Sequence, residues 1–336
     1  MIKQAISKVV DGRNLSEKET VDVFMQIMNG GATDAQIACF LCALRMKGET
    51  IDEITGAVHV MREKALKIAP KMDMLVDTCG TGADSTGTFN ISTTAAFVVA
   101  GAGIPVAKHG NRSVSSKSGS CDVLSSLGVR IDVSPETVTK CIEDANIGFL
   151  FAPHFHSAMK YAIGPRKEIG IRTIFNIIGP LTNPAWAKAQ LIGVYDPGLT
   201  EPLAKVLLNV GTKRAYIVHG YPLDEISICG ETRITELRDS KISTYTVRPE
   251  DFGIDTVNIS KIIGGTPEEN AKITLDILNN QKGPKYDITI LNAAAAIAAS
   301  GGADTIKDAL PLAIKSIEST KALQALEKLK EITNAN

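Results

Sequence analysis

One stretch, residues 76–93 (VDTCGTGADSTGTFNIST), limits most strongly what this chain can fold into. It starts with the end of a short apolar run, which closes at Asp77, and a loop rich in glycine, serine and threonine follows. Polar residues then lead directly into an apolar, helix-like segment at 94–102. This order predicts a strand, a glycine-rich loop and a helix N-terminus. Such an arrangement suits a phosphate, because glycines let the backbone approach a ligand and a helix start offers free N–H groups and a positive dipole. An ordinary glycine-rich turn is the alternative.

The first seventy residues carry only the patterns of helices. Ser16 and Glu19 have the spacing of a capping box, Asp34 opens a second helix, and Thr50 with Glu53 forms another capping box. The short loops between these helices indicate antiparallel neighbours. No motif in this region carries chemistry.

From Met74 onward, short β-branched runs alternate with helical patterns, as in α/β domains. Residues 227–248 alternate instead as antiparallel strands do. The predicted fold is α/β, with a small all-helical domain at 1–70 and a large α/β catalytic domain at 71–336 around a central, mostly parallel sheet. We expect a helical segment around 160–187 to join the small domain.

Composition narrows the function classes. The chain has 36 basic and 37 acidic residues among 336, and this balance gives no sign of a nucleic-acid-binding face or of a membrane-binding surface. The longest apolar run, at 292–300, is too short to span a bilayer, and the N-terminus lacks the apolar core of a signal peptide. We therefore expect a cytoplasmic protein. Cys39 and Cys42 form a CxxC, but they lie in an apolar helix-like stretch without a second pair, which favours buried core thiols over a metal or redox site.

A second polar loop follows the predicted strand at 104–107. Residues 108–120 (KHGNRSVSSKSGS) combine cations, a histidine and five serines with two glycines. A basic loop rich in hydroxyls, at the end of a strand, is what a polyphosphate ligand requires. The alternative is a flexible, solvated loop, which such low-complexity sequence often forms.

Residues 151–184 offer further polar candidates. His154 and His156 are two residues apart, so in a helix they point to different faces and make a poor metal pair. Arg166 follows a Gly-Pro pair near an element boundary, a suitable place for a guanidinium that binds a carboxylate. On position alone, a surface charge is the alternative for Arg166.

Asp224 and Glu225 lie just past another predicted strand, at 214–218. Two hard carboxylates beside a phosphate site favour Mg²⁺, although a solvated turn gives the same pair. All three polar loops follow strands, and ligands of α/β sheets bind at that edge. The chain has neither a Walker loop nor a dinucleotide fingerprint. These residues therefore predict a Mg²⁺-dependent enzyme that acts on a phosphorylated small molecule.

Four segments (GTGADSTGTFNIST, KHGNRSVSSKSGSCDVLSSLG, GPRKEIGIRTIFNIIGPLTNP and HGYPLDEIS) resemble the anthranilate phosphoribosyltransferase family. The resemblance covers nearly the whole chain, up to the GGTPEENA and LNAAAA stretches. It implies a nucleoside phosphorylase/phosphoribosyltransferase-like fold and a homodimer formed through the helical domain. It also implies the transfer of a phosphoribosyl group from 5-phosphoribosyl 1-diphosphate (PRPP) to the amine of anthranilate, in tryptophan biosynthesis.

The resemblance also implies the site residues. Those that hold PRPP would be Gly80, Ala83, Asp84, Thr88, Asn90, Ile91, Ser92, Thr93, Lys108, His109, Gly110, Asn111, Arg112, Ser113, Val114, Ser115, Ser116 and Ser120. Gly80, Asn111, His156 and Arg166 would contact anthranilate. Ser92, Asp224 and Glu225 would bind two Mg²⁺ ions. Ala83 stands where the family pattern GTGGD has glycine, which bears on the detailed pose of the loop.

The charges suggest a mechanism. Cleavage at ribose C1 produces an oxocarbenium-like cation and a diphosphate, so Mg²⁺ and Lys108 would stabilise the departing negative charge. The anthranilate amine is a neutral nucleophile that needs little activation, which leaves His109 as a candidate proton acceptor. Arg166 would orient the carboxylate, and closure of the helical domain over the substrates would exclude water.

Two other functions stay open at this point. A pyrimidine nucleoside phosphorylase would share the architecture, but its KHSTGGVGD-like loop is absent. A nucleic-acid-binding paralogue without activity is the second alternative, and the balanced net charge is an argument against it.

Overall fold

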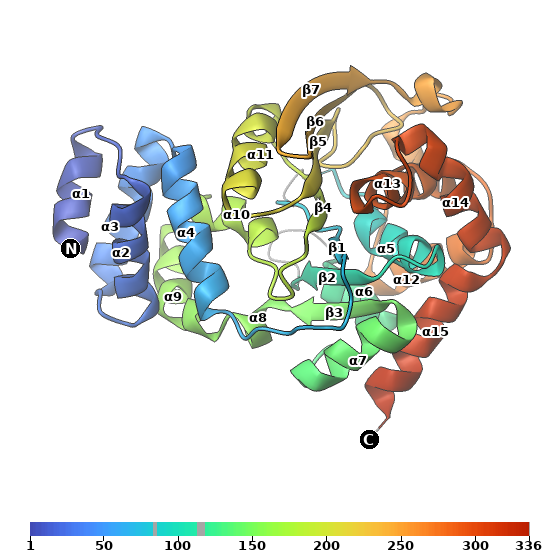
Figure 1. Cartoon of the computed structure of the whole chain (residues 1–336), viewed down its shortest axis with the longest axis horizontal. Coiled ribbons are helices and arrows are strands. Elements are labelled where there is room, and N and C mark those ends of the chain that lie inside the picture. Colours follow the sequence, from blue (N-terminus) through green and yellow to red (C-terminus); the bar gives the residue numbers. More distant parts are fainter. Residues whose placement is uncertain (83–85, 113–117, 336) are drawn as a thin grey trace.

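A mostly parallel sheet forms the centre of the molecule (Figure 1). The computed structural model describes residues 1–82, 86–112 and 118–335. Within these residues the strand order is β3-β2-β1-β4-β5-β6-β7. The strands are β1 (Val76–Asp77), β2 (Val106–Gly110), β3 (Ile147–Phe151), β4 (Ala189–Gly193), β5 (Arg214–Gly220), β6 (Thr232–Arg238) and β7 (Lys241–Val247). The first five strands pair in parallel, whereas β6 and β7 pair antiparallel, as the sequence predicts.

Helices cover both faces of this sheet, as a parallel sheet requires. The α-helices after β1 are α5 (Ile91–Gly101), α6 (Ser120–Ser126), α7 (Pro135–Ala145), α8 (Ala152–Phe155), α9 (Lys160–Ile169), α10 (Ile174–Ile178), α11 (Thr200–Asn209), α12 (Pro267–Leu278), α13 (Pro284–Ser300), α14 (Ile306–Glu318) and α15 (Lys321–Asn334). Short 3-10 turns lie at Ser157–Met159, Gly179–Leu181, Pro197–Leu199, Pro249–Phe252 and Ile259–Lys261. The alanine-rich α13 packs on β4 and β5 and is buried along its length because its small side chains allow close approach.

A helical body lies at one end of the sheet (Figure 1). It consists of α1 (Ile2–Val10), α2 (Glu17–Met28), α3 (Asp34–Lys47) and α4 (Ile51–Lys64). The predicted capping boxes of α2 and α4 are present, and both satisfy backbone N–H groups at the helix start. The helical body shares its hydrophobic core with α9 and α10: the ring of Phe24 lies 6.3 Å from Phe40 and 5.6 Å from Phe175 of α10.

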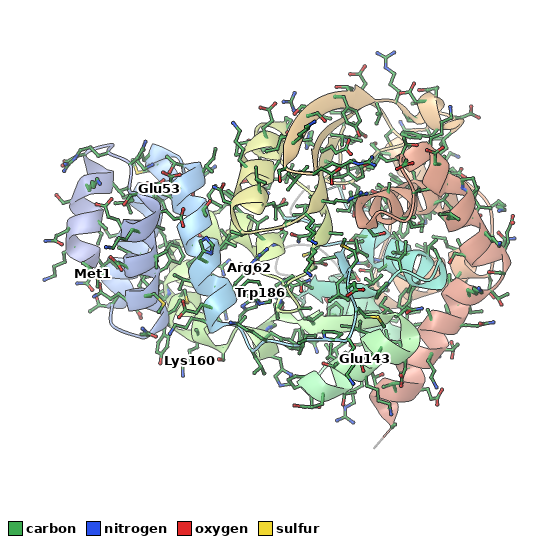
Figure 2. All side chains as sticks on the ribbon, viewed as in Figure 1. Met1, Glu53, Arg62, Glu143, Lys160 and Trp186 are labelled. Atoms are coloured by element: carbon green, nitrogen blue, oxygen red, sulfur yellow. The ribbon has the colours of Figure 1, made fainter. Side chains whose placement is uncertain are left out.

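Arg62 joins α4 to the sheet side of the molecule. Its Nε donates to the carbonyl of Leu181 at 2.7 Å and its Nη1 to the carbonyl of Val210 at 3.1 Å. The guanidinium also lies 5.6 Å from the centre of the Trp186 ring (Figure 2). Burial lowers the pKa of Arg62 to about 10, and the side chain still carries its charge at neutral pH. Two carbonyls and an aromatic face therefore offset the desolvation of this cation.

Two predicted boundaries near the polar loops are wrong. The strand expected at 104–107 continues through Lys108, His109 and Gly110, because its backbone stays paired with β3 as far as Phe151. Lys108 and His109 therefore lie on a buried strand, not on a loop. The helix expected at 94–102 begins three residues earlier, at Ile91.

The prediction for the CxxC cysteines is also wrong in part. Cys39 is exposed and Cys42 is half-buried, since the apolar residues of α3 that face the core are Ile37, Phe40, Leu41 and Leu44. In the described residues, no helix is both long enough and apolar enough to cross a membrane.

Asn292 of α13 fixes the segment that follows Asp224 and Glu225. Its Oδ1 accepts a hydrogen bond from the N–H of Ile226, and its Nδ2 donates to the carbonyl of the same residue, both at 2.9 Å. Asn292 and Ile226 are both fully buried. The carboxylate pair is thus anchored from behind by a helix far along the chain.

We predict that Asn292→Leu, which has a similar volume, lowers the free energy of unfolding by about 2–4 kcal/mol, because two buried backbone groups lose their partners. Urea denaturation measures this change. Asn279→Ala is the matched control: Asn279 is exposed at the end of α12 and its Nδ2 reaches only a carbonyl of its own helix. That variant should change stability by less than about 0.5 kcal/mol. Equal effects of the two variants would contradict the anchoring role of Asn292.

Candidate active site

The loops after β1, β2 and β5 meet in one polar cavity of about 430 Å³ at the carboxyl edge of the sheet. Every described residue predicted to hold PRPP or Mg²⁺ lines this cavity: Gly80, Thr88, Asn90, Ile91, Ser92, Thr93, Lys108, His109, Gly110, Asn111, Arg112, Ser120, Asp224 and Glu225. The remaining predicted residues, Ala83, Asp84, Ser113, Val114, Ser115 and Ser116, lie outside the described residues.

A second cavity of about 310 Å³ adjoins the first and is more apolar. The two cavities share His109, Asn111, Ala152, Phe175 and Gly179. Three of the four residues predicted for anthranilate line the second cavity, namely Asn111, His156 and Arg166, whereas Gly80 lines only the first. Its apolar walls, which include Met61 of α4 and Phe175 of α10, were not predicted, because apolar residues carry no motif.

Lys108 lines the polar cavity, and the buried carboxylate of Asp77 lies near it. The Nζ of Lys108 donates to the carbonyl of Thr78 and lies 3.4 Å from Ser92 Oγ. Asp77, fully buried at the end of β1, accepts hydrogen bonds from the N–H of His109 at 3.1 Å and from Asn183 Nδ2 at 2.7 Å. Burial raises the pKa of Asp77 to about 6, and the nearby charge of Lys108 opposes that shift. Lys108 thus presents its charge from a fixed position.

Asn183 is a second functional candidate that sequence reasoning missed. Its Nδ2 also donates to the carbonyl of Ala107 at 2.8 Å, so one amide joins β1 and β2 beside the cavity. Asn183 lies in the GPLTNP part of a recognised segment, but nothing in the local pattern shows which strand ends it contacts.

His109 and His156 lie where the two cavities meet. Their ring centres are 5.1 Å apart, and both side chains are buried. Burial lowers the pKa of His109 to about 3, with a further contribution from His156, and lowers the pKa of His156 to about 4. Both rings are therefore neutral at pH 7. All four ring nitrogens are buried, and the backbones of Gly179 and Thr182 raise the pKa of His109 and His156 slightly against the larger effect of burial.

Arg166 supplies a cation to the second cavity. Its guanidinium stacks over the ring of Phe175, 5.0 Å from the ring centre, and is half-buried. Burial lowers the pKa of Arg166, but a guanidinium stays charged. A desolvated, stacked guanidinium beside apolar walls is suited to the carboxylate of an aromatic acid.

Asp224 and Glu225 line the same polar cavity as Ser92, and a Cβ on Gly80 would lie 3.4 Å from Asp224 Oδ2. The backbone of Asp224 passes so close to Gly193 that a Cβ there would lie 1.5 Å from the Asp224 carbonyl oxygen. Two carboxylates and a hydroxyl are hard oxygen ligands, and this set fits Mg²⁺.

A different cluster, Asp77, Cys79 and His109, also brings three potential ligand atoms within 4.8 Å of one another. It fits Mg²⁺ poorly. Both oxygens of Asp77 already accept hydrogen bonds. Burial also raises the pKa of the Cys79 thiol, which keeps the sulfur protonated.

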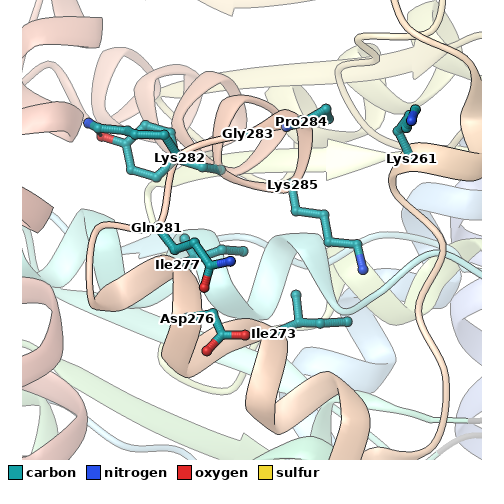
Figure 3. A pocket seen from close by; sticks show the side chains of 10 residues that line it. Lys261, Ile273, Asp276, Ile277, Gln281, Lys282, Gly283, Pro284 and Lys285 are labelled. Carbon is teal, nitrogen blue, oxygen red and sulfur yellow. Dashed lines mark hydrogen bonds between the residues drawn. The ribbon is translucent and has the colours of Figure 1, made fainter.

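A third cavity of about 250 Å³ lies between α12 and α13 (Figure 3). Its lining includes Lys261, Asp276, Lys282 and Lys285. It shares no lining residue with the other two cavities and contains none of the predicted site residues.

Comparisons with known proteins agree with this arrangement. Residues 72–323 match the model of the glycosyl transferase family, a/b domain, and residues 3–65 match that of its helical bundle domain. A protein of Acetivibrio thermocellus named anthranilate phosphoribosyltransferase is 54% identical over all of this chain and 97% of its own length. One from Moorella thermoacetica with the same name is also 54% identical, over 98% of this chain and 97% of its own length.

Solved structures are similar as well. The crystal structure of anthranilate phosphoribosyltransferase from Thermus thermophilus superposes with a TM-score of 0.93 at 38% identity, covering 98% of this chain and 99% of that one. The enzyme from Saccharomyces cerevisiae in complex with PRPP and Mg has a TM-score of 0.90 at 29% identity, covering 99% of this chain and 97% of that one.

The buried neutral state of His156 predicts a pH dependence of stability. Its folded pKa of about 4 lies below the ordinary value of 6.5, so its contribution is complete above pH 6.5 and is lost as the pH falls toward 4. Between pH 7 and pH 4.5, His156→Gln should lose about 2 kcal/mol less stability than the wild type. Denaturant titration at the two pH values measures the difference. His154→Gln, at an exposed position two residues earlier, should behave as the wild type does. Identical pH dependence in the wild type and His156→Gln would refute the prediction.

Proposed function

The chain belongs to the anthranilate phosphoribosyltransferase family, and we propose that its two adjoining cavities carry out that family's reaction. The enzyme transfers the phosphoribosyl group of PRPP to the amine of anthranilate, giving N-(5-phosphoribosyl)anthranilate and diphosphate in tryptophan biosynthesis. The observation that supports this most is the junction of a polar cavity and a more apolar one at His109 and Asn111. A phosphorylated ribose suits the first cavity and an aromatic acid suits the second.

In this arrangement the chain's own residues place both substrates. Arg166 binds the carboxylate of anthranilate and directs the amine toward the junction of the cavities, where ribose C1 lies. Neutral His109 accepts a hydrogen bond from the amine. Its low pKa makes it a poor general base, which suits a neutral amine nucleophile. The fixed charge of Lys108 in the polar cavity stabilises the departing diphosphate.

The yeast enzyme was solved with PRPP and Mg, which supports the use of Mg²⁺ by this chain. We propose that Asp224, Glu225 and Ser92 hold two Mg²⁺ ions per subunit, because these residues offer hard oxygen ligands beside the phosphate loops. When bound, the metal neutralises negative charge on the diphosphate.

The assembly is a homodimer in this proposal. The outer sides of α1 and α3 expose Met1, Val10, Cys39 and Met46, with 87% of the Met46 surface accessible. A second copy of the chain would cover these residues, and sedimentation equilibrium measures the resulting mass.

We further propose that residues 1–70, with the segment around 160–187, form a small helical domain that closes over the site. A cytoplasmic location stays a prediction.

The decisive assay follows anthranilate fluorescence after mixing with the protein, PRPP and Mg²⁺, with and without EDTA. Loss of fluorescence that requires all three components supports the transferase. No loss, together with phosphate-dependent cleavage of a pyrimidine nucleoside, would assign the chain to the phosphorylase alternative. Salt-dependent DNA binding without either activity would favour the non-catalytic paralogue.

Arg166→Ala should raise the KM for anthranilate about 10- to 100-fold, as expected for a lost charge-assisted hydrogen bond, and change the KM for PRPP less than about threefold. Steady-state kinetics with each substrate varied in turn provide the measurement. Lys167→Ala, at the exposed neighbouring position, is the control and should change neither constant. Equal losses for the two substrates in Arg166→Ala would contradict its assigned role.

Asp224→Asn combined with Glu225→Gln should raise the Mg²⁺ concentration for half-maximal activity at least about tenfold, because amides bind the cation more weakly than carboxylates do. Activity measured across a Mg²⁺ titration tests this. Asp239→Asn, in the exposed turn between β6 and β7, controls for the loss of negative charge alone. An unchanged Mg²⁺ requirement would remove Asp224 and Glu225 from the metal site.

A further inference from the structure

One stretch that resembles the family, GGTPEENA at 264–271, has no part in the site described so far. None of its residues lines either cavity of the active site. It nevertheless lies against the end of the glycine-rich loop, because Asn270 forms a hydrogen bond with Asn90, which is 180 residues earlier in the chain.

The residues just before α12 extend the glycine-rich loop by a short antiparallel pairing. Thr88 forms a β-bridge with Ile263, and the N–H of Gly264 donates to the carbonyl of Gly87 at 2.9 Å. A Cβ at residue 264 would lie 2.6 Å from the Cα of Phe89, so a glycine is needed for this approach. The backbone of 87–89 is therefore held from outside the cavity.

Asn270, in the first turn of α12, continues this support through its side chain. It is 2% exposed. Its Oδ1 accepts a hydrogen bond from the N–H of Gly265 at 2.8 Å, and its Nδ2 donates to Asn90 Oδ1 at 3.0 Å. Asn90 in turn donates from its Nδ2 to the carbonyl of Ser118 at 3.2 Å, and Ser118 Oγ donates back to Asn90 Oδ1.

The direction of this chain of hydrogen bonds is fixed at both ends by the backbone. The N–H of Gly265 can only donate, so Asn270 presents its amide nitrogen to Asn90. The carbonyl of Ser118 can only accept, so Asn90 presents its nitrogen there and its oxygen to Asn270. The two amides thus link the end of the glycine-rich loop to the end of the basic loop.

The packing of the helices supports this link. α12 packs against both α5 and α6, which begin where the glycine-rich loop and the basic loop end (Figure 1). One turn beyond Asn270, Thr274 shares a hydrogen bond of 2.9 Å with Thr94 of α5. Thr274 belongs to the same helix contact, but its hydrogen bond does not involve a side chain of either loop.

We propose that Asn270 is a positioning residue that sets the spacing between the two phosphate-binding loops, and with it the affinity for the phosphorylated substrate. This inference rests on the proposed function, because it assigns PRPP to the polar cavity. Asn270 acts through Asn90 and Ser118 and does not itself line the cavity. In the proposed function anthranilate binds in the second cavity, which Asn111 of the basic loop lines but to which α4, α8, α9 and α10 contribute most of the walls. Loss of the link should therefore weaken the binding of PRPP and leave the binding of anthranilate nearly unchanged.

The test uses Asn270→Asp and Asn270→Ala in the full-length chain. The aspartate keeps the size and the acceptor for Gly265 but removes the donor to Asn90, so it tests the proposal even where the alanine variant fails to fold. We expect the KM for PRPP to rise about tenfold, the usual scale for one buried hydrogen bond, while the KM for anthranilate stays within about twofold. Hydrogen exchange of the peptide at 86–93 should become faster in the same variants.

Thr274→Val is the matched control, since it removes one buried hydrogen bond from the same helix contact. It should lower the melting temperature without raising the KM for PRPP. A rise in that KM equal to the one in the Asn270 variants, or an unchanged KM for PRPP in folded Asn270→Asp, would overturn the proposal. Wild-type protein that fails to consume anthranilate would refute the proposed function instead, which keeps the two failures distinct.

Discussion

Buried asparagine amides hold the active-site loops at the edge of the sheet. A loop that lines a cavity cannot pair its backbone as a strand does, yet its buried N–H and C=O groups still need partners. One amide side chain supplies both a donor and an acceptor. Asn183 joins the ends of β1 and β2, Asn270 the glycine-rich and basic loops, and Asn292 the segment after Glu225. All three are at most 2% exposed, and they place the groups that face the ligand without occupying the cavity.

The two cavities differ in the charged residues that line them. The polar cavity is lined by the cations Lys108 and Arg112 and by the carboxylates Asp224 and Glu225, so the proposed diphosphate and its cation would meet charges of both signs. The adjoining cavity is mostly apolar, and two cations, Lys160 and Arg166, are among its described lining residues. Two neutral histidines separate the two environments because burial keeps them from ionising. A cation at that junction would repel the oxocarbenium-like centre, so neutrality there favours the reaction.

The parts of this site that sequence could predict are those with a local chemical signature. Glycines, hydroxyls and cations following short apolar runs indicated the polar loops, and the described residues among them line one cavity. Asn183, Asn270 and Asn292 could not be found this way, since their partners lie 106, 180 and 66 residues away. Local pattern also misplaced Lys108 and His109 on a loop, because polar residues on a buried strand contradict the usual apolar run. No sequence pattern indicated that Met61 lines the second cavity, because its position depends on where α4 packs against the rest of the molecule.

That docking decides the shape of the second, more apolar cavity. Met61 and Arg62 are consecutive on α4, and Met61 lines the cavity while Arg62 donates to carbonyls of the sheet side of the molecule. A buried guanidinium must keep its acceptors, because the alternative is an unpaired charge away from water. The wall that Met61 provides is therefore tied to the position of Leu181, in the turn that follows α10 and Phe175. Arg166 stacks on that same Phe175. The apolar wall and the guanidinium of Arg166 thus depend on one small region, and a movement of the helical body that displaced one would displace the other with it.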